Sequence, residues 1–169
     1  MGWNTSALFV RAWSVEQLID FLPDVFSYEA TGETVTAEEA WCGSPGERLY
    51  LAQAHGWCQM WDPDQRFAPR LNRMLERPGE MEDTQALAVL FDGVSSTYSF
   101  WLYESGVLVR HATFESGNCI EQTGAALAIE SKVAIPSWGH DEDFLWAVIT
   151  AVTGLKDDTD QLFVVYSVD

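Results

Sequence analysis

The amino-acid sequence predicts a single α+β domain, spanning residues 1–169, in which a mainly antiparallel sheet is combined with about three helices. A length of 169 residues is close to the usual size of one domain. Three β-rich runs follow one another after residue 84 and are separated only by short turns, which is typical of an antiparallel meander. Apolar residues recur at helical spacing in three other segments, and each of these ends at proline or glycine.

The chain opens with a predicted strand and a predicted helix. Residues 5–13 are rich in apolar and β-favouring types, so they predict a largely buried first strand. Ser14, with Gln17 three positions later, forms a capping box, and the amphipathic helix that it opens ends at Pro23.

Residues 25–36 allow two interpretations. A pair of strands could turn at Gly32. Thr36 with Glu39 offers instead a second capping box, which opens a short helical turn through Trp41.

The stretch HGWCQMWDPD, residues 55–64, predicts a turn followed by a central strand. The run RLYLAQAH before it predicts the preceding strand. Side chains alternate between the two faces of a strand, and in WCQMW both faces are mainly apolar. A strand of this kind is covered on both sides, so Trp57 and Cys58 are predicted to lie in the core.

Residues 69–77 predict a helix that ends at Pro78-Gly79. Three arginines recur on a face other than its apolar one: Arg70, Arg73 and Arg77. They are compatible with a phosphate site or with a solvated face, and the acidity of the chain favours the solvated face.

The second half predicts the meander TQALAVLFD, TYSFWLYES and GVLVRHATF, then a short strand within residues 118–131. Acids in the first turn and Gly154 at the end delimit a helix that begins at Asp141. The run QLFVVYSV predicts the last strand. Four large aromatic residues are predicted to lie in the core: Trp57, Phe100, Trp101 and Trp146.

Charge is the strongest global signal. The chain carries 26 acids against 9 bases, a formal net charge of −17, which repels nucleic acid and anionic membranes. Any charged partner is therefore expected to be basic, although acidity can also serve solubility alone. No apolar run approaches the roughly 18 residues of a membrane-spanning helix, and the start does not resemble a signal peptide, so a cytoplasmic location is expected.

No motif for catalysis, nucleotide binding or metal binding is present, so no cofactor is expected. Three widely spaced cysteines form neither a disulfide framework nor a CxxC site. His140, before three acids, is the best pH-sensitive or metal-binding candidate, with a solvated helix start as the alternative. Cys119 is the best candidate for a reactive thiol, although no basic neighbour in the sequence would lower its pKa.

The start MGWNTSALFV, the central GWCQMW and the run FDGVSSTYSFWLYESGVLVRHATFESGNCIEQTGAALAIES resemble an uncharacterised bacterial family of small α+β proteins. Its members start M-G-x-x-T and later carry a strand, G-x-L-V-R and a second strand. The resemblance covers residues 84–131 best, and Asn4 stands where members have lysine. It implies the fold and transfers no functional residue. Acidic, tryptophan-rich single domains also occur among bacterial immunity proteins, which is an analogy.

The leading hypothesis is a non-catalytic, acidic protein-binding module, most concretely a bacterial immunity protein that neutralises a basic toxin domain. The turn at Pro63 is expected to expose two carboxylates beside a surface tryptophan. The predicted partner-binding residues are Trp61, Asp62, Asp64, Asp141, Glu142 and Asp143. The alternative is a small-ligand-binding or enzymatic domain with an aromatic pocket, whose walls would include Trp41, Trp57 or Trp138. A structural subunit of a larger assembly is a third hypothesis, and the sequence indicates no oligomeric state.

Overall fold

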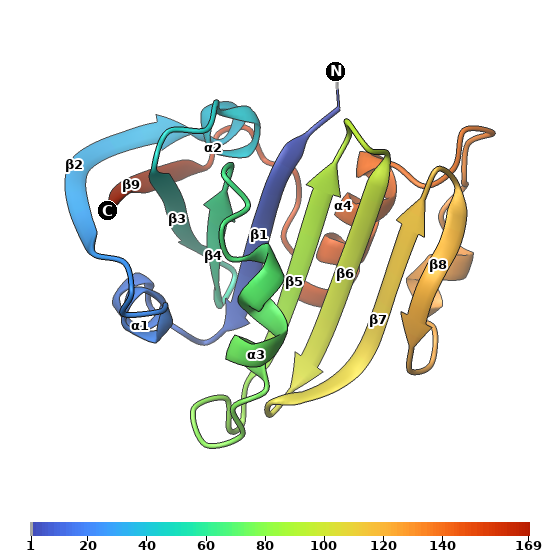
Figure 1. The fold of residues 1–169 in the computed structure, drawn as a ribbon, viewed down its shortest axis with the longest axis horizontal. Helices are drawn as coiled ribbons and strands as arrows, with labels where there is room; N and C mark the ends of the chain where they lie inside the picture. The colour runs from blue at the N-terminus through green and yellow to red at the C-terminus, as the bar shows by residue number, and fades with distance from the viewer. Residues whose placement is uncertain (1) are drawn as a thin grey trace.

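β1 (Asn4–Arg11) is the central strand of the sheet, because its side chains are apolar on both faces and its six middle residues are buried. It pairs antiparallel with β4 (Trp57–Asp62) on one side and with β5 (Gln85–Asp92) on the other. The computed structural model describes residues 2–169 and places β1 fifth in a nine-stranded sheet, of order β2-β9-β3-β4-β1-β5-β6-β7-β8 (Figure 1).

All neighbouring strands of this sheet run antiparallel. The remaining strands are β2 (Tyr28–Thr36), β3 (Arg48–Ala54), β6 (Thr97–Glu104), β7 (Val107–Glu115), β8 (Asn118–Thr123) and β9 (Leu162–Val168). The helices are α1 (Val15–Phe21), α2 (Ala37–Cys42), α3 (Leu71–Leu75) and α4 (Glu142–Thr153), with short 3-10 helices at Ala68–Arg70 and Ala128–Ser131. The last strand does not extend the meander but lies between β2 and β3.

Helices cover the two faces of the sheet in pairs. α2 and α4 pack their buried side chains into one apolar cluster, and α1 and α3 pack theirs into another on the opposite face. Figure 1 shows α3 in front of the central strands and α4 behind β5 and β6. The sheet is therefore the middle layer of three.

The expected α+β architecture with a mainly antiparallel sheet is confirmed, with four α-helices among the described residues instead of about three. The capping box of Ser14 and Gln17 is present. Residues 28–36 form one strand paired with β9, not a strand pair, and Thr36 then caps α2. The strand pair turning at Gly32 is therefore wrong, and the short helix opened by Thr36 is confirmed.

The aromatic residues predicted for the core divide into two groups. Trp57 and Phe100 are buried, as expected. Trp101 and Trp146 are only half-buried and pack at the margins of the two clusters. The predicted helix at 69–77 is shorter than expected, because only Leu71–Leu75 is α-helical.

The start of the chain is held against the β5–β6 turn by a close approach of two glycines. A Cβ on Gly93 would lie 2.4 Å from the Cα of Gly2. The Gly93 amide donates to the carbonyl of Trp3 at 2.8 Å. Only a residue without a side chain fits here, so this contact sets the position of the Trp3 backbone.

We predict that Gly93→Ala lowers the free energy of unfolding by about 1–3 kcal/mol, because the new methyl group would overlap the Gly2 backbone. Gly79→Ala is the control, since no atom lies within 4 Å of its would-be Cβ, and it should change stability by less than about 1 kcal/mol. Urea denaturation followed by tryptophan fluorescence measures both. Equal stabilities of the two variants would contradict the assigned contact.

Candidate functional site

Four tryptophans from separate parts of the chain form one cluster on the face covered by α2 and α4. They are Trp3 before β1, Trp41 on α2, Trp61 on β4 and Trp146 on α4. The ring centroids of Trp41 and Trp146 are 5.0 Å apart, those of Trp61 and Trp146 5.6 Å, and those of Trp3 and Trp41 5.8 Å. The rings therefore touch one another and form a continuous aromatic surface.

Hydrogen bonds orient two members of this cluster. Trp61 Nε1 donates to Gln59 Oε1 at 2.9 Å, and both residues are buried. The Trp3 backbone amide donates to Glu142 Oε1 at 3.1 Å, which ties the start of the chain to α4.

The other two indoles are held by ring contacts. Within residues 2–169, neither Trp41 Nε1 nor Trp146 Nε1 has a hydrogen-bond partner, and both atoms are shielded from solvent. Replacing either ring by phenylalanine would therefore remove no hydrogen bond.

Two adjoining cavities open over the tryptophan cluster. The acidic cavity, of about 450 Å³, has the rings of Trp3, Trp41 and Trp146 among its walls. Its carboxylates are Glu38, Glu142, Asp143 and Asp157. The Gln59 cavity, of about 430 Å³, is lined by residues that include Trp41, Gln59, Leu155, Lys156 and Asp157. Because Trp41 and Asp157 line both, we call the two together the tryptophan groove.

The acidic cavity carries a negative field. Among the described residues that line it, four are carboxylates and none is lysine or arginine. Burial together with Glu38 and Glu142 raises the pKa of the Cys42 thiol. A cation is the charge that this cavity favours.

The predicted partner-binding residues do not form one surface. Asp141 caps α4 by accepting from the Phe144 amide, and Glu142 and Asp143 line the acidic cavity. Asp64 is half-buried, accepts from the Glu47 amide and pairs with Arg66.

The expectation that Trp61 and Asp62 lie at the surface is wrong. Both have an exposed fraction of 0%. Trp61 is the fully buried member of the tryptophan cluster. Asp62 points to the opposite face of the sheet, because side chains alternate along β4. Of the three proposed pocket tryptophans, Trp41 lines the groove, whereas Trp57 and Trp138 line neither of its two cavities.

The sequence missed Trp3, Gln59, Glu38 and Asp157 as groove residues. Gln59 was visible as the one polar side chain within the apolar run WCQMW, and a buried polar group of this kind needs a partner or a role. The other three come from segments that meet only through the folding of the whole sheet, so no local pattern joins them.

Asp62 is a buried carboxylate in which one oxygen accepts a hydrogen bond and the other does not. Its Oδ2 accepts from the Phe67 amide at 3.2 Å, whereas its Oδ1 lies 4.0 Å from Arg66 Nη1, which is too far for a hydrogen bond. Neither Asp62 Oδ1 nor Arg66 Nη1 has a hydrogen-bond partner within residues 2–169. Burial outweighs the nearby guanidinium and the backbone amides, and raises the Asp62 pKa to about 6.

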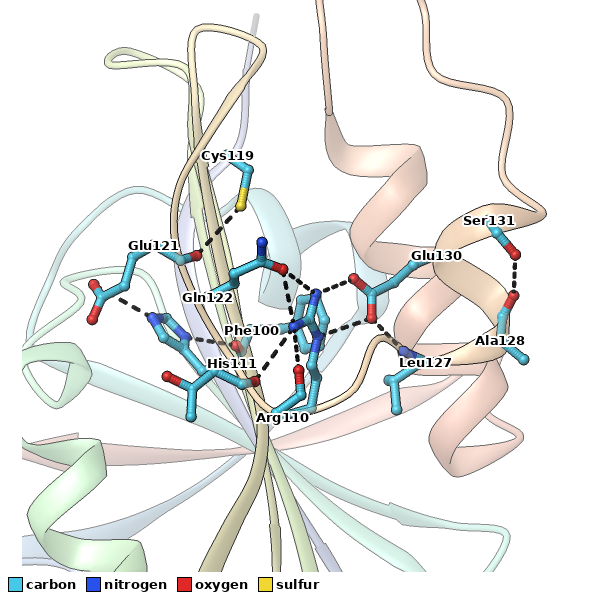
Figure 2. A network of polar contacts seen from close by, with 12 residues as sticks. Phe100, Arg110, His111, Cys119, Glu121, Gln122, Leu127, Ala128, Glu130 and Ser131 are labelled. Atoms are coloured by element: carbon cyan, nitrogen blue, oxygen red, sulfur yellow. Dashed lines mark hydrogen bonds and ion pairs between the residues drawn. The ribbon is translucent and has the colours of Figure 1, made fainter.

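A second polar cluster lies at the sheet edge formed by β7 and β8 (Figure 2). Arg110, with an exposed fraction of 3%, donates from Nε and Nη2 to the two carboxylate oxygens of Glu130, at 3.0 and 2.7 Å. Its remaining donors reach Gln122 Oε1 and the carbonyls of Thr123 and Gly124. Every nitrogen of the guanidinium therefore has an acceptor, so it offers no free donor to a ligand. The cluster ties β8 and the 3-10 helix at Ala128–Ser131 to the sheet.

The histidines and Cys119 form no metal site. The His111 ring stacks on Trp101, with Nδ1 3.0 Å from the Phe100 carbonyl. His140 stacks on Phe114 at 3.6 Å, and burial lowers its pKa. Cys119 is exposed on β8. In the part of the chain that the structure describes, no group of three His, Cys, Asp or Glu side chains could hold a metal ion.

We predict that Asp62 makes the protein less stable as the pH rises from about 4 to 6. The folded state keeps the Asp62 proton up to about pH 6, whereas the unfolded state releases it near the ordinary pKa of 3.8. The folded state therefore binds more protons between these values, and up to about 3 kcal/mol of stability is lost across this window. In urea titrations, Asp62→Asn should lack this loss, and Asp20→Asn, which removes an exposed carboxylate, should retain it. Parallel pH profiles of Asp62→Asn and the parent protein would refute the assignment.

We predict that Arg110→Met lowers the free energy of unfolding by about 3–5 kcal/mol, because it leaves the Glu130 carboxylate buried without its partner. Adding Glu130→Gln should restore part of this loss, since glutamine still accepts from the Leu127 amide. Arg48→Met, which breaks an exposed pair with Glu33, should cost about 1 kcal/mol or less. Similar losses of unfolding free energy for Arg110→Met and Arg48→Met would show that the edge cluster does not tie β8 and the 3-10 helix to the sheet.

Comparison of the chain with protein-family models, with curated proteins and with solved structures found no match in any of the three. None of the helices within residues 2–169 has the length and apolar character that crossing a membrane requires.

Proposed function

We propose that this protein is a non-catalytic binding module that recognises a basic protein partner through the tryptophan groove. The observation that supports this most strongly is the acidic cavity itself, in which four carboxylates surround an aromatic floor. Aromatic anchors in a concave site and carboxylates around them are the features that bind basic side chains of a partner.

The charge of the whole chain supports the same proposal. A formal net charge of −17 attracts a basic partner over a distance of about 8 Å at physiological ionic strength and accelerates encounter. The groove then supplies what charge alone does not, namely apolar surface that is removed from water on binding.

Neutralisation of a basic toxin domain is the most concrete form of this proposal. A toxin that acts on nucleic acid presents cationic side chains to phosphate groups, and an acidic groove can cover them in the same way. The support is the charge and the groove, together with the analogy to immunity proteins.

The second candidate function is the binding of a small ligand in the Gln59 cavity. Its support is one observation: Gln59 has an exposed fraction of only 5% and yet lines a cavity of about 430 Å³. A buried amide at the wall of a cavity is a common means of orienting a polar ligand.

We predict that reversing three groove charges, Glu38→Lys with Asp143→Lys and Asp157→Lys, strongly weakens binding of the partner. All three side chains are exposed and make no side-chain hydrogen bond or ion pair within residues 2–169, so folding should be nearly unaffected. The matched control reverses three exposed acids on the other face, two on α1 and one directly after α3: Glu16→Lys, Asp20→Lys and Glu76→Lys.

Affinity capture with the parent protein and both triple variants identifies the partner, and binding kinetics across a salt series then test the mechanism. A basic partner should bind the control within about tenfold of the parent and the groove variant at least about 100-fold more weakly, because reversed charges oppose it directly. Its association rate with the parent should fall as salt rises. If both variants lowered the affinity for the partner equally, the effect would come from net charge alone, and the groove would not be the binding site.

A further inference from the structure

We infer that the tryptophan groove binds an arginine residue within a peptide, with the guanidinium in the acidic cavity and a main-chain carbonyl on Gln59. This inference rests on the proposed function and names the chemical group that the groove selects.

A guanidinium fits the acidic cavity better than a compact ammonium ion. The rings of Trp3 and Trp146 are half-buried, so part of each is open to the cavity above the cluster. A planar guanidinium stacks on an indole face and is more weakly hydrated than ammonium. Its five donors in the same plane can reach several carboxylates, and Glu38, Asp143 and Asp157 come from three separate segments around the floor.

The Gln59 cavity offers a hydrogen-bond donor to its ligand. Trp61 Nε1 is a donor only, so the Gln59 atom that it contacts must be Oε1, and Nε2 is the free end of the amide. Gln59 is more than nine-tenths buried and lines the cavity, and no acceptor for its Nε2 exists among residues 2–169. A carbonyl oxygen of the ligand is the group that completes it.

The two requirements apply to one ligand because the cavities adjoin. Trp41 and Asp157 line both of them, so a cation in one and a carbonyl in the other lie on either side of the same indole. A metal ion or a simple amine supplies a cation without an acceptor. An arginine within a polypeptide supplies both, since its side chain carries the guanidinium and its main chain carries the carbonyl.

The test uses N-acetyl-L-arginine amide as the probe, titrated into ¹⁵N-labelled full-length protein. Indole N–H signals, assigned by single Trp→Phe variants, report each tryptophan separately. The signals of Trp41 and Trp146 should shift with saturation at a dissociation constant on the order of 1 mM, as expected for a ligand of this size. The signal of Trp138, which is 72% exposed and lies outside the groove, should not move.

Two further compounds separate the two subsites. N-acetyl-L-citrulline amide keeps the shape and loses the charge, so it should bind at least tenfold more weakly. Propylguanidine keeps the cation and lacks a carbonyl. Gln59→Glu preserves an oxygen for Trp61 and removes the free donor, so at pH 8 it should weaken the arginine probe at least fivefold and should not weaken propylguanidine.

A second variant guards against misfolding of the first. Trp146→Phe removes no hydrogen bond and leaves a smaller ring, so it should fold and should weaken both cationic compounds by at least threefold. Equal binding of the arginine and citrulline probes, or shifts confined to Trp138, would overturn the inference. So would a Gln59→Glu variant that weakens both cations equally.

The outcome is separable from that of the proposed function. If the groove charge reversal strongly weakens partner binding while the arginine probe does not bind, the proposed function stands and the arginine inference fails. If the probe binds as predicted while charge reversal leaves partner binding unchanged, the inference stands and the proposed function fails.

Discussion

The structure depends on the burial of β1 and β4 on both of their faces. These neighbouring strands carry apolar side chains toward α2 and α4 on one side and toward α1 and α3 on the other. Neither face can be left to water without exposing large apolar area, so the helices are required as covering layers. The tryptophan groove follows from this requirement, because α2 and α4 bring Trp41 and Trp146 onto Trp61 and the gap between the two helices remains open above the rings.

Local patterns were predicted well, and patterns that depend on distant partners were not. The Ser14 capping box and the β5–β6–β7 meander involve neighbours in sequence, so the residues concerned carry the whole signal. The insertion of β9 between β2 and β3 joins strands more than 100 residues apart, and no property of QLFVVYSV indicates which strand edge it joins.

The error at Trp61 and Asp62 has a physical origin. An acidic turn after a strand is normally exposed. Here the chain after Asp62 turns back, so that the Phe67 amide donates to the Asp62 carboxylate, and α3 follows soon after. The carboxylate is therefore covered. Of the six predicted binding residues, Glu142 and Asp143 line the groove, because the acids of a first helical turn lie at the end of α4 that faces Trp3.

The contrast between Arg110 and Gln59 could not be predicted from sequence, since both are buried polar residues in strands. Arg110 has a partner for every donor, and Gln59 does not.

The position of β9 also determines when this protein can become complete during its synthesis. β2 lies at the sheet edge with β9 as its neighbour, and β3 lies on the other side of β9. When residues 28–54 leave the ribosome, β2 has no strand to pair with, and it remains unpaired until more than a hundred further residues have followed. The segment that carries Lys156 and Asp157 emerges only just before β9. Closure of the sheet and assembly of the groove are therefore late, nearly simultaneous events, and a nascent chain would expose Trp3, Trp41 and Trp61 well before α4 and the segment after it supply Trp146 and Asp157.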